Sequence, residues 1–212
     1  YTIKKFSFVE FKEFVISIRK SFNKIRLNQI ISLIPQHFDI IILSIVSDFE
    51  SVGIYQFSKR LVEPINYVIY SFTPWIQNKL KNNFEDFDVQ SFIKQILLPI
   101  AIFIILIYIF FGRTIIVIIG SKLFLNSYVP MIILSFGFVF YLLTFWIRQF
   151  LLLRNLIQFH SYGRIIYFAA FLSFTFLLVD QYNEIGISLS LTIAILLQKS
   201  FEYLIYRKKL KS

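Results

Sequence analysis

Hydrophobic residues gather into six long runs along the chain, each close to the ~20 residues that an α-helix needs to cross a bilayer. The runs cover residues 29–47, 61–76, 92–111, 129–147, 165–179 and 185–205. The second and the fifth run are the shortest, so their ends are the least defined. This pattern predicts six transmembrane helices joined by short loops, none long enough to fold as a soluble domain.

The first 28 residues have a different pattern, in which basic and large apolar side chains alternate at near-helical spacing. Such a segment is typical of a helix on a membrane surface, with its basic face toward anionic headgroups. It is either a tether to the first span or a lipid-sensing element. The predicted organisation is an interfacial cytoplasmic segment (1–28), a six-helix transmembrane lobe (29–206) and a basic cytoplasmic tail (207–212).

Composition and charge agree with an all-α membrane protein. Of the 212 residues, 57% are hydrophobic and 16% are charged, against about 25% charged in soluble domains. The net charge of +10 comes from basic residues concentrated in alternate flanks of the spans. By the positive-inside rule, both ends of this piece are expected in the cytoplasm. Because the sequence begins with Tyr1 and not Met, we expect it to be a piece of a longer protein.

Polar residues form a stripe on the first predicted span. Asn28, Ser32, Gln36 and Asp39 follow one another at steps of four, four and three residues, which places them on one helix face. Pro35 leaves a backbone carbonyl one turn earlier without its donor, and a neighbour or water must satisfy it. A carboxylate at membrane depth is costly unless it faces a bundle interior or water. The stripe is therefore interpreted as one wall of a polar passage.

Two interpretations of Asp39 remain open at this point. The carboxylate either contacts an ion or cargo, or forms a structural ion pair with Lys59 or Arg60. His37 lies on a different face and is a poor metal site without a second ligand, although it could assist proton coupling.

The fourth and sixth predicted spans also carry polar lines. One consists of Gly137, Tyr141, Thr144 and Arg148, the other of Glu184, Ser188 and Thr192, followed by Lys199 and Glu202 at i,i+3. Small and hydroxyl residues of this kind also serve simple helix packing in lipid. Arg148 either lines the passage or extends its charge to the membrane interface.

The loops offer little for catalysis. Asp86 and Asp88 resemble the metal-binding pair of some glycosyltransferases, but a solvated acidic loop explains them better, since no nucleotide-binding fold surrounds them. The apolar segment 112–126 is too short to cross and return, so we expect it at the outer interface. Without cysteines, phosphate-binding loops or nucleophile motifs, we expect no enzyme, no metal and no cofactor.

The stretch 39–74 resembles the second half of the polysaccharide (O-antigen type) flippases of the multidrug/oligosaccharidyl-lipid/polysaccharide exporter superfamily. The similarity lies in Asp39, an apolar run, the motif Val52-Gly53-Ile54-Tyr55 that enters the next span, and Pro74. Gly120 and a closing helix pair split near Gly186 extend it to the end of the chain. Pro35, Gly53, Tyr55 and Pro74 are expected at turns or hinges.

The resemblance implies that the chain is the carboxy-terminal six-helix lobe of a twelve-helix alternating-access transporter in the bacterial inner membrane. It implies transport of an undecaprenyl-pyrophosphate-linked oligosaccharide to the outer leaflet, coupled to an ion gradient. Its partners would be membrane lipids, the missing amino-terminal lobe, and glycan polymerase and glycosyltransferases, with no nucleic acid. Candidate pathway residues are Gln36, Asp39, Arg60, Tyr141 and Arg148.

Three alternatives stay open. A membrane-embedded polysaccharide polymerase would need a large basic outer loop, which the predicted loops do not provide. An exporter of drugs or of lipid-linked peptidoglycan precursors from the same superfamily would have a similar pattern. In a purely structural subunit, the polar stripes would only pack helices.

Overall fold

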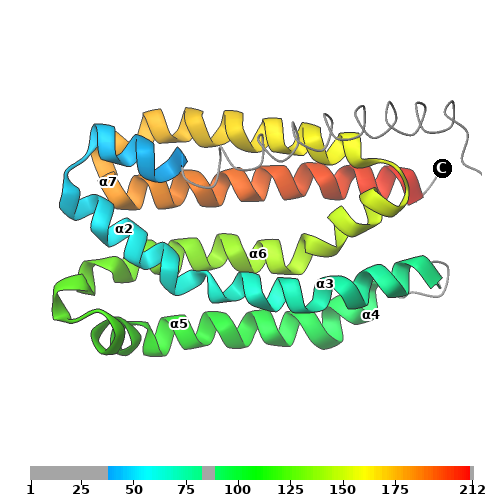
Figure 1. The fold of residues 1–212 in the computed structure, drawn as a ribbon, viewed down its shortest axis with the longest axis horizontal. Helices are drawn as coiled ribbons and strands as arrows, with labels where there is room; N and C mark the ends of the chain where they lie inside the picture. Colours follow the sequence, from blue (N-terminus) through cyan, green and yellow to red (C-terminus); the bar gives the residue numbers. More distant parts are fainter. Residues whose placement is uncertain (1–37, 83–88, 211–212) are drawn as a thin grey trace, which may run out of the picture. The chain divides into compact units, whose positions relative to one another are not determined.

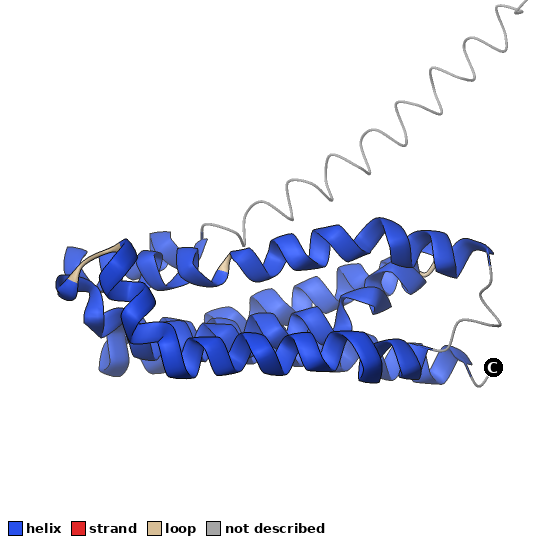
Figure 2. Cartoon of the chain, turned by 90° about the horizontal axis from the view of Figure 1, so that it is seen from below, coloured by secondary structure: helices blue, strands red, loops and turns tan. Residues whose placement is uncertain are grey.

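The computed structural model describes residues 38–82 and 89–210, and all regular structure within these ranges is helical (Figure 2). The chain divides into two units, Tyr1–Phe38 and Asp39–Ser212, and the description below concerns the second. Its elements are a helix over residues 38–46, α2 (Phe49–Val62), α3 (Pro64–Asn82), α4 (Val89–Phe92), a π-helical turn η1 (Ile93–Leu97), α5 (Leu98–Ile119), a 3₁₀ turn η2 (Lys122–Ser127), α6 (Tyr128–Leu153) and α7 (Ile157–Leu210).

Local sequence explains several of the helix boundaries. Asp48 caps α2 by accepting the Ser51 N–H at 2.8 Å, and this hydrogen bond lowers the pKa of the Asp48 carboxyl. Pro64 opens α3, where its missing N–H is not needed. Pro99 has the opposite effect near the start of α5, because it cannot donate to the carbonyl four residues earlier. The helix widens there into η1, and the Leu98 N–H bonds to the Ile93 carbonyl.

The helix α7 is a hairpin of two arms. The backbone leaves helical geometry at Asn183 (φ 42°, ψ −119°), and residues 157–182 and 184–210 run antiparallel (Figure 1). Gly186 lies against the first arm, since a Cβ there would come within 2.4 Å of the Leu178 carbonyl oxygen. Ser47 donates to Asn183 Oδ1 at 2.7 Å and ties the end of helix 38–46 to this turn.

The helix α6 is the centre of the described unit and packs against α2, α3, α5 and α7 (Figure 1). Buried side chains from most of its faces form the core, including Leu134, Phe145, Trp146 and Ile147. Hydroxyl groups join Ser127, the last residue of η2 directly before α6, to α2: Ser58 donates to the Ser127 carbonyl at 2.9 Å, and Ser127 donates to the Ile54 carbonyl at 3.1 Å. These bonds satisfy polar groups inside an apolar bundle.

Three described helical stretches are long and apolar enough to cross a membrane: Ile93–Ile119, Lys122–Leu153 and Ile157–Lys208. In the most apolar window of the first stretch only 17% of residues are buried, against 56% in the second. The most hydrophobic helix therefore presents its side chains outward, among them Phe103, Phe110 and Ile118. Water would oppose that arrangement, whereas acyl chains favour it.

The predicted all-helical class is confirmed, whereas the six-helix lobe stays a prediction. Residues 29–37 of the first apolar run lie outside the described residues, and the second run is divided between α2 and α3. The fifth and sixth runs form the single element α7. Residues 112–119 continue α5 instead of forming a separate interfacial segment, so only η2 remains before α6. The expected segment 1–28 lies outside the described residues.

The close contact between α6 and α7 should depend on Gly137. A Cβ at this position would lie 3.0 Å from Thr192 Oγ1 and 3.2 Å from Thr192 Cα, and Thr192 itself donates to the Ile133 carbonyl across the same contact. We expect Gly137→Ile to lower the free energy of unfolding by about 1–3 kcal/mol through overpacking, measured by thermal unfolding in detergent. Phe136→Ile at the neighbouring exposed position is the control and should leave the transition unchanged.

Candidate functional site

Two groups of buried charged side chains lie in the described unit. The first, the Asp39 cluster, consists of Asp39 from helix 38–46 together with Tyr55 and Lys59 from α2. The second, the Glu202 cluster, consists of Glu202, Lys199 and Gln198 from the second arm of α7 and His160 from the first arm. Charged groups inside apolar helices are the natural place to look for function in a membrane protein.

In the Asp39 cluster the carboxylate is enclosed and fully paired. Asp39 has no solvent exposure, accepts a hydrogen bond from the Tyr55 hydroxyl, and lies 2.5 Å from Lys59 Nζ. Tyr55 and Lys59 are one helical turn apart on α2, so one face of that helix supplies both partners. This is the geometry of the structural ion pair, and its basic partner is Lys59. Arg60 is exposed on α2.

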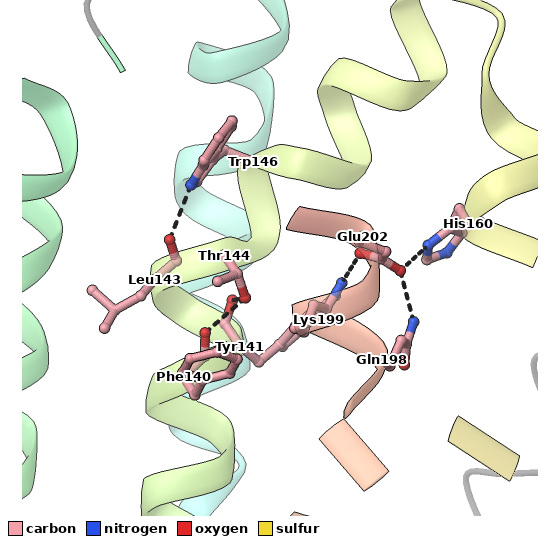
Figure 3. Close-up of polar contacts among 9 residues, drawn as sticks. All are labelled: Phe140, Tyr141, Leu143, Thr144, Trp146, His160, Gln198, Lys199 and Glu202. Atoms are coloured by element: carbon pink, nitrogen blue, oxygen red, sulfur yellow. Dashed lines mark hydrogen bonds and ion pairs between the residues drawn. The ribbon is translucent and has the colours of Figure 1, made fainter. Parts of the chain in front are cut away.

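In the Glu202 cluster one buried carboxylate is held by three side chains (Figure 3). Lys199 Nζ donates to Oε2 at 2.7 Å, Gln198 Nε2 donates to Oε1 at 2.9 Å, and His160 Nδ1 lies 2.7 Å from Oε1. Glu202 is 0% exposed, Lys199 2% and His160 6%. The contact between His160 and Glu202 joins the two arms of α7 across 42 residues of sequence.

Gly163 makes room for this carboxylate. A Cβ at residue 163 would lie 3.0 Å from Glu202 Oε1. The first arm of α7 can therefore approach Glu202 with its backbone, while His160 reaches it from one turn earlier.

More positive charge surrounds the Glu202 cluster. The Lys199 ammonium lies 4.7 Å from the centre of the Tyr141 ring. Arg164 interacts electrostatically with Glu202, Tyr141 and Arg148. We define these residues as the cationic site: Lys199, Arg164 and Arg148 supply three cations, and Glu202 supplies the carboxylate.

The cationic site has hydrogen-bonding capacity to spare. Arg148 Nε and His160 Nε2 are buried atoms without a hydrogen-bond partner. A buried donor without an acceptor, such as Arg148 Nε, is costly. The arrangement therefore favours the binding of an anion, for which Arg offers planar, bidentate geometry.

The structure brings some predicted residues together and separates others. Tyr141 and Arg148 belong to the cationic site, and Lys199 and Glu202 form the pair expected from their i,i+3 spacing. Pro35, Gln36 and His37, as well as Asp86 and Asp88, lie outside the described residues. Glu184, Ser188 and Thr192 lie on the second arm of α7, where Ser188 donates to the Glu184 carbonyl.

Three of the expected turn and hinge residues lie within helices, and the fourth, Pro35, lies outside the described residues. Gly53 and Tyr55 are interior residues of α2, and Pro74 is interior to α3. The chain turns before α2, at Ser47 and Asp48, because the Asp48 cap starts the helix there. A Cβ at Gly53 would meet no atom within 4 Å, so packing does not require glycine at this position.

Sequence reasoning missed His160 and Arg164. Both lie in a predicted cytoplasmic loop, 42 and 38 residues before Glu202, and only the α7 hairpin brings them to it. The four-residue spacing of His160 and Arg164 was the available signal, because it places both on one helix face.

A comparison of the chain with protein-family models, with curated proteins and with solved structures found no significant match. The geometry of the site is therefore the basis for the function proposed below.

A double-mutant cycle tests the Asp39 cluster. Asp39→Asn and Lys59→Met each remove one charge of this ion pair and leave the opposite charge in place, so each should lower the free energy of unfolding by about 3 kcal/mol. The double variant should lose clearly less than the sum of the two. Thermal unfolding of the purified protein in detergent gives all four values, and Glu50→Gln at an exposed position is the control. Additive losses would show that the two charges do not stabilise each other.

Proposed function

We propose that this chain forms part of a membrane transporter that moves an undecaprenyl-pyrophosphate-linked oligosaccharide from the cytoplasmic to the outer leaflet. The observation that carries the proposal is Arg148, whose buried Nε has no hydrogen-bond partner, in a helix long and apolar enough to cross a membrane. A passing anion would supply an acceptor for this donor in surroundings where water is scarce.

A lipid-linked pyrophosphate suits this site chemically. Each of its two phosphates carries a negative charge, and Arg148 and Arg164 could both donate to phosphate oxygens. The isoprenoid tail would stay in the acyl chains, beside outward-facing rings such as Phe103 and Phe110 of α5. The cargo thus divides between a charged interior and an apolar exterior.

The positive charge of the cationic site also ranks the alternative functions. A drug exporter commonly carries cations, which the cationic site would repel. A lipid-linked peptidoglycan precursor also carries a pyrophosphate, so it remains the second candidate cargo. A polymerase would need a catalytic group reaching the glycan, and the described buried charges lie within the helices instead.

Further parts of the proposal follow from the resemblance described above. A companion amino-terminal lobe would complete the transport path, and both ends of this piece would lie in the cytoplasm of a bacterial cell. Glycan polymerase and glycosyltransferases would act on the same lipid-linked units. The coupling of transport to an ion gradient is also proposed from this resemblance.

Charge removal at Arg148 tests the proposal. In cells whose surface glycan depends on this gene, we expect Arg148→Gln in the full-length protein to lower surface glycan roughly tenfold or more. This matches the ~1.5–3 kcal/mol of a hydrogen bond to a charged group. Lipid-linked oligosaccharide should accumulate on the cytoplasmic face, measured by mass spectrometry. Arg207→Gln, an exposed arginine of the same helical unit, is the matched control and should have no effect.

A defined result would contradict the proposal. If Arg148→Gln and the triple variant Arg148→Gln/Arg164→Gln/Lys199→Gln were made at normal levels and kept normal surface glycan, the cationic site would have no part in glycan export.

A further inference from the structure

One arginine faces outward from the most apolar helix of the described unit. Arg113 lies on α5, at the edge of the bundle (Figure 1), and its side chain is exposed. The neighbouring side chains on the same helix face are apolar and also exposed: Phe110 (73%) lies one turn before Arg113, and Val117 (38%) lies one turn after it. A cation in such surroundings needs a polar partner, because acyl chains offer none.

The start of α6 holds the Arg113 guanidinium in place. Arg113 Cζ lies 5.1 Å from the centre of the Tyr128 ring, in a cation–π contact. The Tyr128 hydroxyl donates to the Ile109 carbonyl at 2.9 Å, so the ring is fixed against α5. Gly112 makes room for the ring, since a Cβ there would lie 3.0 Å from Tyr128 Cε2. The fold therefore positions this charge on the outer surface of the bundle.

The guanidinium keeps its hydrogen-bonding capacity. Among the described residues, the partner of Arg113 is the Tyr128 ring, and the ion pairs formed there do not include it. An arginine has five N–H donors in a planar fork, which matches the oxygens of a phosphate group. The exposed charge is thus available to an anion in the surroundings of the protein.

The position of Arg113 along α5 places it near the lipid headgroups. The 27 residues of Ile93–Ile119 span about 40 Å, so this stretch extends about 5 Å beyond each edge of a hydrocarbon core of about 30 Å when it is centred in the membrane. Arg113 precedes Ile119 by six residues, or about 9 Å, which places its backbone about 4 Å inside the core. A long arginine side chain reaches the headgroup region from that depth.

We infer that Arg113 and Tyr128 form a binding site for the phosphate of an anionic membrane phospholipid. The guanidinium donates to the phosphate oxygens, while the acyl chains lie along the exposed face of α5 beside Phe110 and Leu106. Charge complementarity favours an anionic headgroup, because its net negative charge compensates the cation that no described carboxylate pairs. The bound lipid anchors the edge helix at this depth, whatever cargo the protein transports.

Native mass spectrometry of the purified full-length protein in detergent tests the site. Two probes with the same acyl chains are compared: dioleoylphosphatidylglycerol, which has a phosphate, and dioleoylglycerol, which lacks one. We expect phosphatidylglycerol to bind at least about tenfold more tightly, as a charge-assisted hydrogen bond would provide. Equal affinities would show that the protein recognises only the acyl chains, and would overturn the phosphate site.

Two variants locate the binding. Arg113→Gln should lower the affinity for phosphatidylglycerol about tenfold, to that of dioleoylglycerol. Lys122→Gln removes an exposed positive charge from η2, directly after α5, and is the matched control that should keep the affinity. Both variants should unfold at nearly the same temperature as the unmodified protein in lipid-free detergent, because both side chains are exposed. Unchanged affinity in Arg113→Gln, or an equal loss in both variants, would overturn the site.

A soluble phosphate is the other source of the same chemistry. Inorganic phosphate lacks the acyl chains that pack on α5, so a large excess should not displace phosphatidylglycerol. Displacement by inorganic phosphate would assign the site to a soluble phosphate compound and overturn the role of the membrane lipid.

Discussion

The contact between Glu202 and His160 is the interaction on which the described bundle most depends. A carboxylate without solvent exposure is tolerable in apolar surroundings only when donors surround it, and here the donors come from both arms of α7. The pair therefore fixes how the arms meet near their open end, while Asn183 and Ser47 fix the closed end. Between these points, Gly137 and Gly163 allow backbones to approach, and α6 fills the remaining space. The arm that this contact holds also carries Arg164, so the stability of the hairpin and the positive charge near the contact have a common origin.

The two buried ionic clusters differ in a way that bears on function. The Asp39 carboxylate is paired with the Lys59 ammonium and the Tyr55 hydroxyl, so its charge is already compensated within the protein. In the cationic site, the buried Nε of Arg148 has no hydrogen-bond partner. Fully paired groups are typical of structural roles, whereas a buried donor without an acceptor is satisfied only when a partner binds. The candidate for cargo binding thus moves from the first polar stripe to the junction of α6 and α7.

Much of the fold could be predicted from the sequence, because the length of an apolar run is a strong signal for a membrane-spanning helix. The runs at 92–111 and 129–147 correspond to α5 and α6, and the closing pair near Gly186 is present as the α7 hairpin. The turn itself lies at Asn183, a residue type that tolerates positive φ almost as glycine does. Contacts between helices could not be predicted as well from the sequence, since they depend on how each helix is rotated about its own axis. Periodicity could pair Lys199 with Glu202 on one helix, but it could not choose between Lys59 and Arg60 or bring His160 to Glu202.

The length of the stretch Ile93–Ile119 has a consequence for the surrounding lipid. Its 27 residues span about 40 Å as a helix, whereas the hydrocarbon core of a bilayer is about 30 Å thick. A helix longer than the hydrocarbon core must tilt or locally thicken the bilayer, at a cost of a fraction of a kcal/mol per Å of mismatch. Within the described residues, α5 packs mainly against α6 and the turns at its own ends, and Tyr108 donates a hydrogen bond to the Leu61 carbonyl of α2, so a change in its tilt would alter these contacts. The tilt of α5 should accordingly depend on bilayer thickness. Thicker bilayers, formed by sterols or long-chain lipids, would favour a smaller tilt.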